Sequence, residues 1–139
     1  MRQLLLVILI SISVDSVSQI LPGMDLEEIG RHMRSSHREF VLRNPPNVDE
    51  LDFIKYEHVS GDKTLIVFVN EKGYCRFTRL MVDIDYLEEY IDEYEQNYEP
   101  AGDNLWIVKS RGEEFSIAVE ESEWMFSVTV RHKDDTEDQ

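Results

Sequence analysis

The chain has 139 residues and a formal net charge of −15 at pH 7, with 14 Lys and Arg against 29 Asp and Glu. An acidic excess of this size repels nucleic acid and anionic membrane surfaces, so we expect neither as a direct partner. Hydrophobic residues make up 42% of the chain, which is sufficient for the core of one domain.

The first 18 residues have the pattern of a secretory signal peptide. An apolar run extends from Leu4 to Val14 behind one arginine, and Ser16 and Ser18 occupy the −3 and −1 positions of a cleavage site. A membrane-spanning helix is the alternative, but it needs roughly 20 apolar residues, and Asp15 ends the run too early. Cleavage after Ser18 is expected, with cleavage after Ser16 as the second choice. We therefore predict an exported protein, periplasmic or secreted, whose mature chain has no stable membrane insertion.

A helix is predicted to begin at Asp25. Asp25 can serve as its N-cap, and Glu28 three residues later can complete a capping box. Pro45 and Pro46 cannot continue a helix, so this helix must end no later than about Leu42.

Three strand-like segments follow, and three more follow a second helix that begins near residue 86. Turn sequences rich in Gly, Asn and Asp separate neighbouring segments; the segments are 53–59, 64–69, 74–82, 104–109, 114–120 and 124–130. The fold class expected is α+β, with two helices packed on a mainly antiparallel sheet of about six strands. Short matches between the halves allow two αβββ repeats, or merely two helices that start alike. We predict a single α+β domain at 19–132, followed by a disordered acidic tail at 133–139 that has no apolar residue.

The second helix carries tyrosines at a spacing of four. Tyr86, Tyr90, Tyr94 and Tyr98 fall on one arc of the helix, and the carboxylates fall on the other. Packing of the rings in the core is the favoured interpretation, and an exposed aromatic platform is the alternative. The carboxylates spread along a helix do not converge on one ion, so no metal site is expected there.

The first helix carries an arginine ridge. Arg31, Arg34 and Arg38 align on one side of it. The ridge can neutralise the chain's own carboxylates, or it can bind an anion or an acidic partner through bidentate contacts.

The strand face turned away from the helices is the other candidate binding surface. If Cys75, Phe77, Trp124, Phe126 and Val128 point toward the helices, alternation places six residues on the opposite face, namely Tyr74, Arg76, Thr78, Met125, Ser127 and Thr129. Tyr, Arg and Met are enriched at interfaces, although an ordinary solvated sheet face remains the alternative. The single cysteine, Cys75, is expected to be a buried core thiol rather than a reactive or intermolecular one.

No catalytic motif, metal motif or cofactor-binding motif accompanies the four histidines, so we expect no enzyme and no cofactor. The export signal and "LPGMDLEEIGRHM" at the start of the first helix, followed by antiparallel strands, resemble small bacterial envelope proteins of the outer-membrane-assembly lipoprotein and β-lactamase-inhibitor-protein-like type. The lipidated cysteine of the lipoprotein branch is missing here. The resemblance implies helices on one face of an antiparallel sheet and a role in protein binding, and it assigns no functional residue.

The function expected is therefore that of a secreted or periplasmic non-catalytic module that binds a protein partner. An acidic proteinaceous inhibitor of a basic enzyme is the first alternative, because high negative charge would steer it onto its target. A small hydrolase is the second, because a spatial triad leaves no local sequence signature.

Overall fold

A single antiparallel sheet of eight strands organises the molecule in the computed structural model, which describes residues 20–43 and 53–137. The predicted signal peptide, residues 1–18, lies outside the described residues. The strand order is β1-β2-β3-β4-β8-β7-β6-β5, so the last strand of each half lies at the centre of the sheet.

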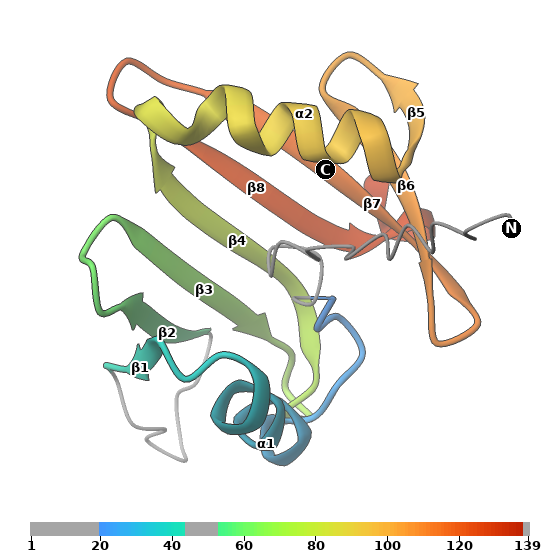
Figure 1. Cartoon of the computed structure of the whole chain (residues 1–139). Helices are drawn as coiled ribbons and strands as arrows, with labels where there is room; N and C mark the ends of the chain where they lie inside the picture. The colour runs from blue at the N-terminus through green and yellow to red at the C-terminus, as the bar shows by residue number, and fades with distance from the viewer. Residues whose placement is uncertain (1–19, 44–52, 138–139) are drawn as a thin grey trace, which may run out of the picture.

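The chain builds this sheet from one helix and four strands, used twice in the same order (Figure 1). The first set is α1 (Leu26–Ser36), β1 (Phe40–Leu42), β2 (Phe53–His58), β3 (Lys63–Val69) and β4 (Cys75–Asp83). A 3₁₀ turn, Ile84–Tyr86, leads into the second set, which is α2 (Leu87–Asn97), β5 (Glu99–Gly102), β6 (Leu105–Ser110), β7 (Glu113–Glu121) and β8 (Met125–His132). Lys133–Glu137 form a short 3₁₀ helix, where the sequence predicts a disordered tail.

The predicted sheet of about six strands, and with it the αβββ unit, is wrong. Each half contains one additional edge strand, β1 or β5. The first helix ends at Ser36, and the residues at 40–42 pair with β2 instead of continuing the helix. The segment of β5 reads Glu-Pro-Ala-Gly, which has neither apolar alternation nor β-branched residues. Such an edge strand forms because its neighbour offers free backbone groups, and Pro is tolerated there.

Local signals in the sequence correctly predict the start of α1 and the turns between the first strands. The Asp25 side chain accepts a hydrogen bond from the Glu28 backbone N–H at 2.9 Å, as an N-cap should. Gly61 and Gly73 adopt φ values of +80° and +82° in the two turns, a conformation that glycine takes without strain.

The halves join through a continuous ladder between β4 and β8, in which Leu80 lies opposite Val128. Both helices pack on the same face of the sheet. The Tyr90 ring of α2 lies 5.2 Å from the Phe126 ring, and the Tyr94 ring lies 5.3 Å from Trp106. The strand register places Phe126 and Val128 of β8 on the same face of the sheet as Tyr56 of β2. Tyr56 lines a small pocket together with Met33 of α1, so α1 lies on this face as well.

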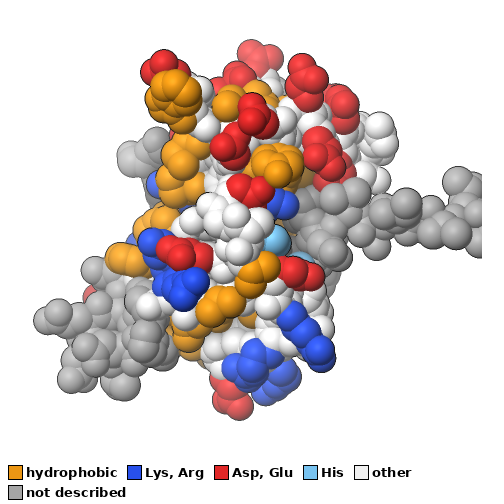
Figure 2. Space-filling view, turned by 60° about the vertical axis from the view of Figure 1, so that its left-hand side comes forward, with side chains coloured by type: hydrophobic (Ala, Val, Ile, Leu, Met, Phe, Trp, Pro, Cys, Tyr) orange, Lys and Arg blue, Asp and Glu red, His pale blue; other side chains and the backbone are white. Residues whose placement is uncertain are grey.

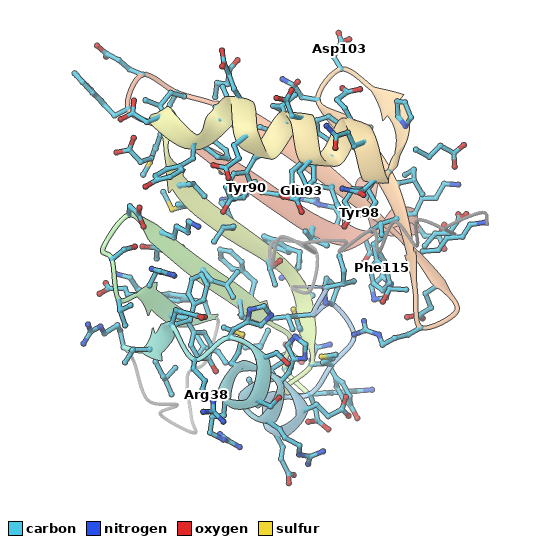
Figure 3. All side chains as sticks on the ribbon, viewed as in Figure 1. Arg38, Tyr90, Glu93, Tyr98, Asp103 and Phe115 are labelled. Carbon is cyan, nitrogen blue, oxygen red and sulfur yellow. The ribbon has the colours of Figure 1, made fainter. Side chains whose placement is uncertain are left out.

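The core on this face confirms two predictions about side chains. Tyr90 and Tyr94 are buried at 7% and 2% exposure, and Tyr86 and Tyr98 are partly buried against the same core, so the tyrosine face of α2 is a core face (Figure 3). Cys75 is also buried, and burial raises the pKa of its thiol to about 12. A thiol of this kind behaves as a small hydrophobic side chain.

Neither described helix can cross a bilayer. Both α1 and α2 have 11 residues, and no helix in residues 20–43 and 53–137 combines the length and the apolar character required.

Candidate binding face of the sheet

The face of the sheet opposite the helices carries a continuous set of side chains, which we call the open face. Helices α1 and α2 both lie on the other side. Register aligns the outward-pointing residues of β2, β3, β4 and β8, which are Phe53, Lys55, Glu57, Thr64, Ile66, Phe68, Phe77, Arg79, Met81, Met125, Ser127, Thr129 and Arg131.

Three phenylalanines form an aromatic row across the open face. Phe53, Phe68 and Phe77 lie opposite one another on β2, β3 and β4. The Phe53 and Phe68 ring centroids are 6.3 Å apart, and the Phe68 and Phe77 rings are stacked at 4.4 Å with an interplanar angle of 18°. Phe53 is 43% exposed, so part of the row is accessible to solvent. Cross-strand aromatic pairs stabilise a sheet, but solvent-exposed rings also provide a contact surface.

Three arginines surround the last ring of the row. The guanidinium carbons of Arg76, Arg79 and Arg131 lie 5.8, 5.9 and 5.1 Å from the Phe77 centroid, within the range of cation–π attraction. Arg79 also donates from Nε to Thr129 Oγ1 at 3.5 Å. We call Phe77 and these three side chains the arginine cluster.

None of the three arginines has a carboxylate partner among the described residues. The ion pairs there are Arg31–Glu27, Arg43–Glu57, Lys55–Glu57 and Lys133–Glu114. In a chain with 29 acidic residues, a group of three arginines without a carboxylate is unexpected, because free carboxylates are plentiful. The arginine cluster is therefore a localised positive region on an acidic protein.

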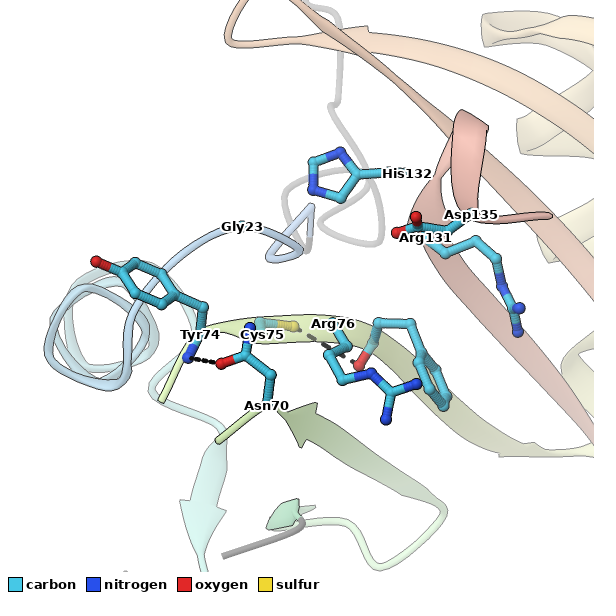
Figure 4. A pocket seen from close by; sticks show the side chains of 9 residues that line it. Gly23, Asn70, Tyr74, Cys75, Arg76, Arg131, His132 and Asp135 are labelled. Carbon is cyan, nitrogen blue, oxygen red and sulfur yellow. Dashed lines mark hydrogen bonds between the residues drawn. The ribbon is translucent and has the colours of Figure 1, made fainter. Parts of the chain in front are cut away.

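A pocket of about 730 Å³ adjoins the arginine cluster at the start of β4 and the end of β8 (Figure 4). Its polar lining comprises Asn70, Tyr74, Arg76, Arg131, His132 and Asp135. Asn70 holds the turn before β4, because its Oδ1 accepts hydrogen bonds from the backbone N–H groups of Lys72 and Tyr74, each at 3.0 Å. This turn places the Tyr74 ring at the rim of the pocket, where it is 44% exposed.

The structure separates the predicted sheet-face residues into two groups. Tyr74 and Arg76 line the pocket, whereas Met125 and Ser127 lie at the other end of the open face. There they border a groove of about 510 Å³ together with Arg79 and Met81. Thr129 lies between these groups on the open face and is only 7% exposed, because it is small and its neighbours are large.

The predicted orientation of Thr78 and Phe77 is wrong. Thr78 is 2% exposed and points toward the helices, while Phe77 lies on the open face. The cause is a register shift, since Phe68 lies opposite Phe77 but Val69 lies opposite Cys75, which leaves an extra residue in β4. A bulge of this kind reverses the alternation that follows it. Trp124, also predicted to face the helices, lies before β8 and is 76% exposed.

The predicted arginine ridge does not form as one line. Helix α1 ends at Ser36, so Arg38 follows the helix, where its Nε donates to the Arg34 carbonyl at 3.3 Å. Arg31 instead pairs with Glu27 at 3.5 Å, and both side chains are exposed. Arg34 and Arg38 come together in a small pocket of about 350 Å³, whose apolar lining is Met33, Phe40, Leu42 and Tyr56.

Acidic side chains are concentrated in the second half of the chain. Residues 20–83 contain nine Lys and Arg against eleven Asp and Glu, whereas residues 84–139 contain four against seventeen. In Figure 2, acidic side chains gather at the end of the molecule that contains α2, and Lys and Arg gather at the end that contains α1. No cluster of His, Cys, Asp and Glu suited to a metal ion occurs among the residues that the structure describes.

The turn between β2 and β3 brings a histidine, a serine and an aspartate together. His58 Nδ1 lies 2.6 Å from Ser60 Oγ, and Ser60 Oγ donates to Asp62 Oδ1. The Ser60 hydroxyl lowers the pKa of the Asp62 carboxyl. In a hydrolytic triad the histidine lies between the serine and the carboxylate, so this order differs. The three residues are two positions apart in the sequence, and their exposed hydrogen bonds lie within a hairpin turn.

Comparison with protein-family models, with curated proteins and with solved structures finds no match for this chain. The resemblance to envelope proteins stays a prediction, and function must be argued from the open face itself.

Proposed function

We propose that this protein is an exported, non-catalytic protein-binding module whose partner docks on the open face. The observation that carries the proposal is the aromatic row, with Phe53 exposed and Phe68 and Phe77 half-buried, beside arginines that have no carboxylate partner among the described residues. Export is proposed from the signal-peptide pattern of residues 1–18.

The composition of the open face supports a protein partner. Aromatic residues, Met and Arg are enriched where proteins meet, and they contribute most of the hot spots. Phe53, Phe68 and Phe77 provide flat apolar area, Met81 and Met125 provide adaptable contacts, and the arginines provide directional hydrogen-bond donors. Burial of such rings contributes roughly 25 cal/mol per Å² of apolar surface removed from water.

A second candidate function is supported by the charge distribution. An acidic inhibitor of a basic enzyme would use the carboxylates concentrated in residues 84–139, with α2 at the centre of the contact. Salt separates the two candidates. Binding through carboxylates spread over α2 should weaken steeply between low and physiological ionic strength, whereas docking on the open face should lose only the part of its affinity that comes from the arginines and keep the part that comes from apolar contact with the aromatic row.

Site-specific photocrosslinking tests which surface meets the partner. Ile66 lies on the open face next to Arg79, and Glu95 lies on the exposed side of α2. Full-length protein carrying p-benzoylphenylalanine at position 66 or at position 95 is expressed in its own cells and irradiated. We expect a discrete crosslinked protein from position 66 and none from position 95.

A crosslink from position 95 alone would support the acidic inhibitor and reject the open face. The absence of a crosslink from position 66 would also reject it, provided that both proteins unfold at the wild-type temperature. Export is tested by N-terminal sequencing of the same material, since an intact Met1 in a cytosolic fraction would contradict it.

A further inference from the structure

We infer that the arginine cluster recognises a short acidic segment of the partner, and that an apolar side chain of the same segment lies on the aromatic row. This inference rests on the proposed function, because it names the chemistry of the partner at the same face. The partner class is a protein segment in which two or more carboxylates lie beside an aromatic or large aliphatic residue.

Positive charge converges on the ring of Phe77. The guanidinium carbons of Arg76, Arg79 and Arg131 all lie within 5.9 Å of the same ring centroid. Three like charges gathered on one ring repel one another, and an anion placed among them removes this repulsion. Guanidinium groups present planar pairs of donors that match a carboxylate, and a charge-assisted bond of this kind is stronger than a neutral one.

No carboxylate among the described residues already occupies this position. None of the ion pairs of the described residues includes Arg76, Arg79 or Arg131. Asp135 lines the same pocket as Arg131, yet no ion pair joins them. The cluster is thus available to carboxylates from another molecule.

Side chains of the open face lie in rows that cross the strands, and two neighbouring rows meet the arginine cluster. One row reads Phe53, Phe68, Phe77 and Arg131 across β2, β3, β4 and β8, and the next reads Lys55, Ile66, Arg79 and Thr129. The first row is apolar over β2 and β3, the second has Lys55 and Ile66 there, and each row has one arginine where β4 meets β8. An extended segment lying across the strands would therefore place its carboxylates over β4 and β8 and its apolar side chain over Phe68.

Charge elsewhere excludes a long polyanion from the same position. The open face also carries Glu57 and Glu120, and the whole chain has a net charge of −15. Nucleic acid or an anionic bilayer would bring many negative charges against these residues, whereas a short acidic segment brings only the few that the arginines can pair.

Fluorescence anisotropy with defined peptides tests the inference. The probe is a fluorescein-labelled peptide of eight residues with three glutamates at one end and a phenylalanine and a leucine at the other. The matched probe replaces the three glutamates by glutamines. We expect the wild-type protein to bind the glutamate peptide at least tenfold more tightly than the glutamine peptide.

Two double variants locate the effect. Arg79→Gln with Arg131→Gln removes two charges from the arginine cluster, and Arg31→Gln with Arg34→Gln removes two from α1. The first pair should abolish the tenfold preference, and the second should retain it. Arg131→Gln alone is the substitute if the first double variant unfolds at a lower temperature than the wild type.

Equal affinities for the two peptides would overturn the inference, as would an equal loss in both double variants. Tighter binding of a single-stranded oligonucleotide or of phosphatidylglycerol vesicles would also overturn it. If the crosslink from position 66 persists in the Arg79→Gln, Arg131→Gln protein, the open face binds its partner without the arginines. In that case the inference about the acidic segment fails and the proposed function stands. If the protein with both wild-type arginines gives no crosslink from position 66, the proposed function itself is rejected.

Discussion

The two halves of the molecule use the same order of one helix and four strands but stabilise the helix in different ways. Helix α1 has a side-chain N-cap, Asp25, and buries the aliphatic residues Ile29 and Met33. Helix α2 has no side-chain cap and buries Tyr90 and Tyr94 against aromatic residues of the sheet. This fold requires each helix to bury one face against the sheet, and that face can consist of either aliphatic or aromatic residues.

The halves also differ in charge, and the proposed function depends on this difference. Most of the excess negative charge lies in residues 84–139. The half with nearly balanced charge supplies the aromatic row and, in Arg76 and Arg79, two of the three clustered arginines. In the proposed function, the half with nearly balanced charge presents most of the contact surface, and the acidic half supplies most of the negative charge.

The largest effect is expected from a substitution in the core of the second half. Trp106 is 1% exposed and contacts Tyr94, so Trp106→Ala should lower the free energy of unfolding by about 3–5 kcal/mol through the cavity that it leaves. Because the β4–β8 ladder joins the halves, urea unfolding should remain a single transition. Hydrogen exchange in β3 should accelerate together with that in β7. Unchanged exchange in β3 would show instead that the halves unfold separately.

Alkaline pH should weaken the tyrosine-packed half. Burial raises the pKa of Tyr98 to about 12 and that of Tyr94 well above 10.0. These phenols stay protonated in the folded state while they ionise in the unfolded chain, so their contribution is complete below pH 10 and is lost above it. Each such group lowers the free energy of unfolding by up to about 1.4 kcal/mol per pH unit.

Urea unfolding from pH 8 to pH 11 measures this loss. Tyr94→Phe should make the decline with pH shallower, because it removes one titrating group. Phe53→Leu, which removes none, should leave the slope at the wild-type value. Equal slopes in Tyr94→Phe and wild type would contradict the assignment.

Removal of the α1 cap should have a moderate effect. Asp25→Ala leaves the Glu28 N–H without its 2.9 Å hydrogen bond, which should cost about 1 kcal/mol. Asp25→Asn keeps an acceptor and should cost less. Chemical denaturation at pH 7 distinguishes them, and identical losses would assign the effect to charge rather than to capping.

The smallest effect is expected on the surface of α1. Arg31 and Glu27 are both exposed, so the double-mutant cycle of Arg31→Ala and Glu27→Ala should give a coupling energy within about 0.5 kcal/mol. This coupling should fall further at high salt. A coupling above about 1 kcal/mol would mean that α1 depends on its charges as well as on its buried face.

Features that depend on a few neighbouring residues could be predicted from the sequence. The N-cap at Asp25, the turns at Gly61 and Gly73, and the buried face of α2 follow from local hydrogen bonding, from glycine's freedom at positive φ, and from the helical period. The predicted strands that became β2, β3 and β4 agree with the structure to within one residue at each end.

Features that depend on a partner strand were decided only by the tertiary structure. Edge strands β1 and β5 form because β2 and β6 offer free backbone groups. The sequence of β1, Phe-Val-Leu, favours a strand but has only three residues, and that of β5, Glu-Pro-Ala-Gly, carries little β signal. The bulge between Cys75 and Phe77 is defined by pairing with β3, and it moves Phe77 into contact with the arginines and Thr78 into the core. A one-residue shift in register reverses the face of every following side chain, so the site could not be assigned before the strands were paired.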